Sequence, residues 1–184
     1  MSEFICRVAE VADAPAIVGL ANQYTYQQLS ATAREGGFLT GNFSVPALQA
    51  MLASVPGQVA YRQQELVGFV VNSWLAAKHY PPLVQQLLAL LPELYYRQRP
   101  LADYRLFFYG PVLVQQAYRG RGLLRQLFQA NQRALAGHFD VGVAFIAAEN
   151  AASLHVHTQK LGLEPVGSLD FAGATYVVLA FAVD

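Results

Sequence analysis

The 184-residue sequence contains a single cysteine, Cys6. One thiol cannot close a disulfide within the chain. This excludes the cross-linked framework of small secreted domains and fits a reducing compartment. The first residues also lack the basic and then apolar pattern of a secretory signal. We therefore expect a cytoplasmic protein.

Charged residues are scarce, at 13% of the sequence, and 12 acidic side chains balance 12 basic ones. Binding to a nucleic-acid backbone needs a cationic surface, so we expect no nucleic-acid partner. No apolar run approaches the roughly 18 residues that suggest a membrane-spanning helix, so we expect no membrane partner. We also expect no metal.

Hydrophobic residues make up 54% of the chain, and the length suits one domain with a substantial core. With so few charges, the surface must be rich in Gln, Ser, Thr and Gly, or be partly covered by a partner. A homodimer is one such arrangement. We expect residues 1–184 to form a single domain.

A glycine-rich basic turn follows an apolar segment and precedes a helical pattern. The segment is Val112, Leu113, Val114, and the turn is Arg119, Gly120, Arg121, Gly122. Where a strand turns into a helix in this way, unpaired backbone N–H groups converge at the positive end of the helix dipole. This arrangement predicts a phosphate site, to which the two arginines add charge. The turn alone would be equally consistent with a solvated basic loop.

The periodicity of apolar residues elsewhere predicts strands alternating with amphipathic helices. Strands are expected at residues 4–8, 58–62, 66–75, 105–115, 141–148, 166–171 and 175–183. Residues 141–148 are apolar on both sides and should lie centrally. The order indicates an α/β fold with a mixed, mostly antiparallel sheet of about seven strands flanked by helices.

Residues 119–124 resemble the acyl-CoA-binding motif of the GNAT superfamily of N-acetyltransferases, Gln/Arg-x-x-Gly-x-Gly/Ala. The sequence departs from it at Leu124, where the family has glycine or alanine. The order of strands and helices matches the family along almost the whole chain. The resemblance implies acetyl-CoA as co-substrate. The cofactor-binding residues it implies are Val112, Leu113, Val114, Arg119, Gly120, Arg121, Gly122, Leu123, Leu124, Arg125, Asn150 and Ser153.

A second segment, residues 150–163, is similar to the family's helix that begins with Asn and has Tyr or His seven residues later. Asn150 and His157 hold these positions, and one residue is inserted before Lys160. The resemblance implies that Asn150 contacts the pantetheine arm. It also implies that His157, if charged, donates a proton to the departing thiolate. Alternatively, Asn150 is only a helix cap and His157 an exposed helical residue, with His155 next to test.

In the family the fourth strand pairs with pantetheine, and a backbone N–H near Val114 polarises the thioester carbonyl, so we assign Val114 a catalytic role. No general base is assigned. Glu149 and Tyr109 are considered, but Glu149 could only complement the helix dipole and Tyr109 could be core. Phe145 stands where some family members have glutamate.

The sequence therefore predicts an acetyl-CoA-dependent N-acetyltransferase that acts on a small-molecule or peptide amine in a ternary complex. The alternative is a non-catalytic acyl-CoA-binding sensor or interaction module with the same fold. The two phenylalanines of loop 34–43 either pack against the body of the protein or form part of a binding wall, and in the second case they suggest a partly apolar acceptor. A helical insertion near residues 80–99 could cover the acceptor site, mediate dimer contacts or add a layer of core.

Overall fold

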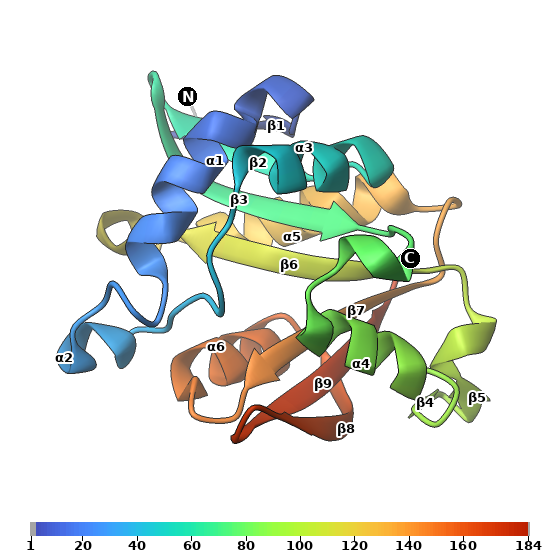
Figure 1. The fold of residues 1–184 in the computed structure, drawn as a ribbon. Helices are drawn as coiled ribbons and strands as arrows, with labels where there is room; N and C mark the ends of the chain where they lie inside the picture. The colour runs from blue at the N-terminus through green and yellow to red at the C-terminus, as the bar shows by residue number, and fades with distance from the viewer. Residues whose placement is uncertain (1–2, 184) are drawn as a thin grey trace.

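The predicted mixed sheet is present in the computed structural model, which describes residues 3–183 (Figure 1). Its seven strands lie in the order β1-β2-β3-β6-β7-β9-β8, and only β6 and β7 are parallel neighbours. The prediction of a mostly antiparallel sheet is confirmed, and β7 lies inside it as expected. The strands are β1 (Ile5–Val8), β2 (Gln58–Arg62), β3 (Glu65–Ser73), β6 (Leu106–Val114), β7 (Val141–Ala147), β8 (Glu164–Phe171) and β9 (Ala174–Ala182).

Helices cover both faces of the sheet. In Figure 1, α1 and α3 lie in front of the β2–β3 half and α5 lies behind it. Ile17 of α1 and Leu48 of α3 are buried in one cluster with Phe69. Leu127 of α5 is buried in another with Val67 on the opposite face. The helices are α1 (Ala14–Ala21), α2 (Ala31–Arg34), α3 (Val45–Ser54), α4 (Pro82–Leu90), α5 (Leu123–Leu135) and α6 (Ala151–His155).

The segment near residues 80–99, expected as a helical insertion, forms α4 and a small hairpin. Leu87 of α4 is buried in the same cluster as Val143 of β7 and Val178 of β9, so α4 adds a layer of core. The hairpin, β4 (Tyr95–Tyr96) with β5 (Arg99–Pro100), was not expected from the sequence. Its strands have two residues each, too short for a period-two pattern. Arg97 and Gln98 form its turn at positive φ without glycine.

The parallel strands β6 and β7 pair over only three residues each, Leu106–Phe108 with Val141–Val143. Beyond Phe108, the register of β6 against β3 shifts between Val70 and Asn72, which places an extra residue at Gly110–Pro111. Such a bulge bends a strand, and Pro111 has no N–H for a ladder hydrogen bond. The edge of β6 facing β7 is therefore unpaired by β7 over its second half.

Packing between β7 and its neighbours leaves no room at Gly142. An added Cβ would overlap the Phe181 ring and lie 2.9 Å from Cζ of Phe107. We expect Gly142→Ala to lower the free energy of unfolding by about 1–3 kcal/mol, measured by urea denaturation. Gly19 in α1 has no heavy atom within 4 Å of such a Cβ. Gly19→Ala should raise stability by about 0.5–1 kcal/mol, and a loss there would contradict this account.

Among residues 3–183, no helix is both long enough and apolar enough to cross a bilayer.

Candidate active site

The open edge of β6 presents backbone groups from alternate residues. Gln115 donates its N–H to the carbonyl of Val67 on β3 at 2.8 Å. Because successive N–H groups of a strand point to opposite sides, those of Val112 and Val114 face the opening beside β7. Leu113 instead pairs with β3, and its side chain is buried against α1 and α3. The structure thus turns Val112 and Val114 toward the predicted pantetheine channel and Leu113 away from it.

The glycine turn leads into α5 with its backbone exposed. Gly120 and Gly122 have φ of 75° and 77°, and a Cβ at either would meet nothing within 4 Å. The N–H groups in the first turn of a helix have no acceptor within the helix. Gly122 is the N-cap of α5 and has no side chain to accept from them. Open space, a positive dipole and unpaired donors suit a diphosphate.

Leu123 and Leu124, the last positions of the motif, both contribute to the core. Leu123 is fully buried, and half-buried Leu124 packs against the same cluster. The departure at Leu124 therefore places an apolar side chain against the protein interior, and the backbone of the turn keeps its glycines.

The three arginines of this region bond to the protein itself. Arg119 donates from Nε to the Val114 carbonyl at 2.9 Å and from Nη1 to the Gly36 carbonyl at 2.6 Å. Arg121 pairs with Glu3 at 2.9 Å, and Arg125 donates to the Lys160 carbonyl at 3.1 Å. Burial lowers the pKa of Arg119. The motif predicts Arg119 and Arg121 as phosphate ligands; in this structure Arg119 ties the turn to loop 34–43.

Asn150 is 4% exposed and caps α6, accepting the Ser153 N–H at 3.4 Å. Its Nδ2 also donates to the Phe38 carbonyl at 2.7 Å. The cap alternative is therefore present in the structure, together with a contact that the sequence did not predict. Asn150 and Arg119 fasten loop 34–43 at two nearby points, Phe38 and Gly36.

Residues Val156–Lys160 form a π-helical turn, in which the Leu161 N–H donates to the Val156 carbonyl at 3.1 Å. This turn accommodates the one-residue insertion expected before Lys160. Such turns add one residue to a helix and are frequent at functional sites. His157 lies in this turn and is 7% exposed, which rules out the exposed-residue alternative. His155 is the exposed histidine of the pair.

His157 is held in one tautomer by its neighbours. Nδ1 lies 2.8 Å from the carbonyl oxygen of Ser153, which can only accept, so Nδ1 carries the hydrogen. In the neutral ring, Nε2 is then a bare acceptor. Burial lowers the pKa of His157 from its ordinary value of 6.5. The proton-donor role predicted from the sequence requires a charged ring, which this environment disfavours.

Tyr109 packs edge-to-face on His157, with ring centroids 5.8 Å apart. Its hydroxyl is buried and has no hydrogen-bond partner within residues 3–183. Burial strongly raises the pKa of Tyr109, so the phenol stays protonated at neutral pH. Of the two base candidates considered from the sequence, Tyr109 is therefore unsuited to accept a proton.

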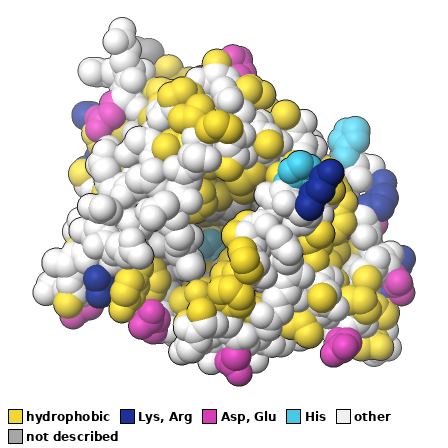
Figure 2. Space-filling view, in the orientation of Figure 1, with side chains coloured by type: hydrophobic (Ala, Val, Ile, Leu, Met, Phe, Trp, Pro, Cys, Tyr) yellow, Lys and Arg dark blue, Asp and Glu magenta, His cyan; other side chains and the backbone are white. Residues whose placement is uncertain are grey.

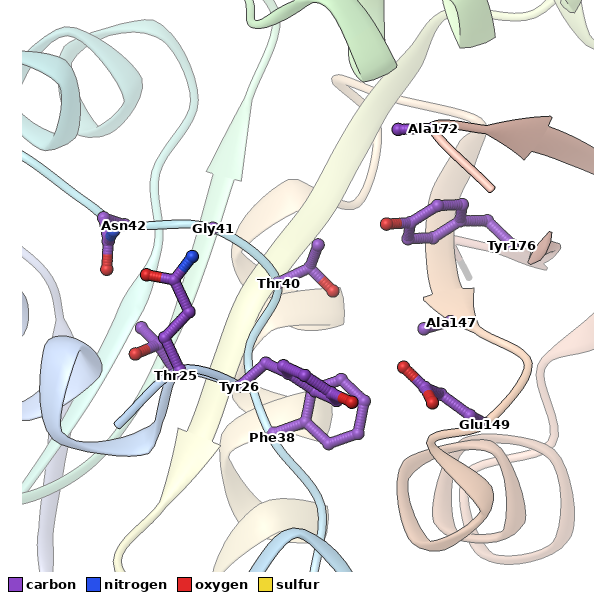
Figure 3. Close-up of a pocket in the computed structure, with 11 residues that line it drawn as sticks. Thr25, Tyr26, Phe38, Thr40, Gly41, Asn42, Ala147, Glu149, Ala172 and Tyr176 are labelled. Atoms are coloured by element: carbon purple, nitrogen blue, oxygen red, sulfur yellow. The ribbon is translucent and has the colours of Figure 1, made fainter. Parts of the chain in front are cut away.

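A pocket of about 420 Å³ lies at the end of β7. One wall carries Tyr26, Phe38 and Thr40, and facing it are Ala147, Glu149 and Tyr176 (Figure 3). The other lining residues are Thr25, Gln27, Gly41, Asn42 and Ala172. The surface is visibly hollowed near the centre of the face drawn in Figure 2, and most charged side chains of that face lie toward its margin.

Both alternatives considered for loop 34–43 occur, each with one of its two phenylalanines. Phe38 lines the pocket, whereas Phe43 packs against the α1–α3 core. Sequence reasoning missed Tyr26 and Tyr176. Tyr26 precedes the glycine-rich loop, and Tyr176 lies within the alternating pattern of β9, so no local signal marked either residue.

Replacing Gly122 tests the diphosphate position. Asn tolerates positive φ, so Gly122→Asn should fold while its side chain obstructs the turn. We expect CoA to bind about tenfold to a hundredfold more weakly, the loss of one charge-assisted hydrogen bond. Gly137→Asn is the matched control, because Gly137 follows the other end of α5 with φ of 78° and open space. Equal CoA affinities by calorimetry would contradict the placement.

No protein-family model matches the chain, and no curated protein matches it in sequence. Solved structures do match in fold. NAA60 of Arabidopsis thaliana, in complex with a bisubstrate analogue, has a TM-score of 0.66 at 13% identity, covering 98% of each chain. The structure of yncA from Salmonella typhimurium with its cofactor acetyl-CoA has a TM-score of 0.63 at 18% identity, covering 100% of this chain and 95% of its own. An acetyltransferase of the GNAT family from Streptococcus pneumoniae has a TM-score of 0.60 at 18% identity, covering 98% of this chain and 100% of its own.

Proposed function

We propose that this chain, which has the fold of GNAT-family acetyltransferases, transfers an acetyl group from acetyl-CoA to a primary amine of a small molecule or peptide. One observation carries the proposal. The unpaired edge of β6 ends at the glycine turn that leads into α5, and β7, which pairs with β6 only as far as Val143, ends at the pocket. The proposed cofactor edge and the proposed acceptor pocket thus lie at the diverging ends of two neighbouring strands.

Acetyl-CoA supplies an activated acetyl thioester when bound. In this proposal the backbone of the Gly120–Gly122 turn and the first turn of α5 bind its diphosphate. Val112 and Val114 pair with its pantetheine arm as an added strand would, and the Val114 N–H polarises the carbonyl that the amine attacks. Positioning and this donor contribute most of the rate.

We assign Asn150 and Arg119 to positioning. Both hold loop 34–43 by its backbone, and Arg119 also bonds to the Val114 carbonyl. Ser153, whose hydroxyl lies 3.3 Å from Nδ1 of His157, remains a proposed cofactor contact.

His157 acts in this proposal as a neutral hydrogen-bond acceptor through Nε2. If its charged form donated a proton instead, kcat would fall as pH rises through a pKa lowered below 6.5. We expect no such fall in kcat as pH rises from the acid range to neutral pH. His157→Phe should change the affinity for acetyl-CoA and leave the shape of the kcat profile unaltered. His155→Phe, exposed on the same helix, should change neither. A profile that loses its basic limb in His157→Phe would restore the donor role.

The activity itself is tested by mixing the protein with acetyl-CoA and a panel of primary amines and following free thiol. We expect thiol release that depends on the amine.

The absence of a carboxylate on β6 or β7 beside the opening, where Tyr109 and Phe145 stand, favours a second candidate, a non-catalytic acyl-CoA-binding module. Tight CoA binding without thiol release for any amine would support that module and contradict the enzyme.

A further inference from the structure

We propose that the pocket at the end of β7 selects a cationic amine with an apolar or aromatic body and no carboxylate, and that Glu149 is the specificity-determining residue. This inference rests on the proposed acetyltransferase function, because the pocket is taken as the acceptor side. It narrows the acceptor from any primary amine to one class.

The lining of the pocket has a negative charge and no positive one. Glu149 is the only charged residue among the residues that line the pocket, and the others are hydroxyl, amide, aromatic or small. The Glu149 carboxylate has no hydrogen-bond or ion-pair partner within residues 3–183. Glu149 is exposed, and its charge is free to pair with a ligand through a charge-assisted hydrogen bond to an ammonium group.

The wall of the pocket opposite Glu149 is aromatic. The rings of Tyr26 and Phe38 meet edge-to-face with centroids 5.0 Å apart, and both side chains lie across the pocket from the carboxylate (Figure 3). Arg34 stacks over the Tyr26 ring at 3.8 Å and donates to the Tyr26 carbonyl, which helps to fix the ring. An aromatic wall of this kind favours an apolar or aromatic body.

The position of the wall is fixed by the body of the protein. Asn150 bonds to the Phe38 carbonyl, and Asn150 directly follows Glu149 in the chain. This hydrogen bond of 2.7 Å holds the backbone of Phe38 beside the segment of chain that carries Glu149. A site held in this way keeps its spacing and can discriminate between acceptors.

The same arrangement disfavours acceptors that carry a carboxylate beside the amine. No Lys, Arg or His lines the pocket to pair with a second negative charge. An amino acid would bring its own carboxylate near Glu149, where like charges repel and neither group is compensated. The lining therefore distinguishes an amine from the corresponding amino acid by charge.

Three acceptors with the same aromatic body test this selection: phenethylamine, phenylalanine and phenylalaninamide. The amide has the size of the amino acid without its charge, which separates charge from bulk. We expect kcat/KM for phenethylamine and phenylalaninamide to exceed that for phenylalanine by about tenfold or more. Glu149→Gln should reduce kcat/KM for phenethylamine by about tenfold or more and should shrink the ratio of phenylalaninamide to phenylalanine.

Glu93→Gln is the matched control, since it removes one negative charge from an exposed residue outside the pocket. It should leave all three values unchanged. CoA affinity should be equal in the wild type and in Glu149→Gln, which separates a role in acceptor selection from damage to the start of α6. Equal turnover of phenylalanine and phenylalaninamide by the wild type, or an unchanged ratio in Glu149→Gln, would overturn the proposal.

Calorimetry on the CoA-saturated protein separates this proposal from the proposed activity. Should no amine release thiol, the acetyltransferase function fails. Binding of phenethylamine that is lost in Glu149→Gln would still support the assigned selectivity. If phenethylamine does not bind the CoA-saturated wild type, or binds Glu149→Gln equally well, the assignment of Glu149 is wrong.

Discussion

The divergence of β6 and β7 is the constraint on which the site depends. After three paired residues, β6 bulges at Gly110–Pro111 and leaves the edge beside β7 open. Each strand keeps a full partner on its other side, β3 for β6 and β9 for β7, so the sheet tolerates the gap. The N–H groups of Val112 and Val114 then face a space where a ligand backbone can satisfy them. An apolar sheet interior thereby gains hydrogen-bonding capacity without any polar side chain.

One guanidinium connects three parts of this arrangement. Arg119, in the glycine turn, donates hydrogen bonds to the carbonyl of Val114 on the open edge of β6 and to the carbonyl of Gly36 in loop 34–43, which lines the pocket. Asn150 holds the same loop two residues further on. The residues that a motif comparison assigns to the cofactor thus also position the acceptor wall. Because these side chains are shared, the cofactor and acceptor sides of the proposed site are mechanically linked.

The sheet was predictable because its strands are long, apolar and separated by clear turns, and the glycine turn was predictable because its chemistry is local. The one-residue insertion before Lys160 was also visible in the sequence, although its form as a π-turn that buries His157 was not. The direction of Arg119 could not be predicted, since its partner Gly36 is 83 positions away and is only a carbonyl. The pocket was hidden for the same reason. Its lining comes from short segments around residues 25–27, 38–42, 147–149 and 172–176, which approach one another only in the folded chain.

A chain with few charged residues can still hold two oppositely charged substrates if the charge is placed at the ends of the site. On the cofactor side, positive potential comes from the backbone of the glycine turn and the dipole of α5. On the acceptor side, the single negative group lining the pocket is Glu149. His157 and Tyr109 pack against each other in the interior, and burial lowers the pKa of the first and raises that of the second, so both favour their neutral forms. In the proposed function, an anionic cofactor and a cationic amine are therefore each attracted to a different, oppositely charged part of the site, and neither needs a strongly charged protein surface.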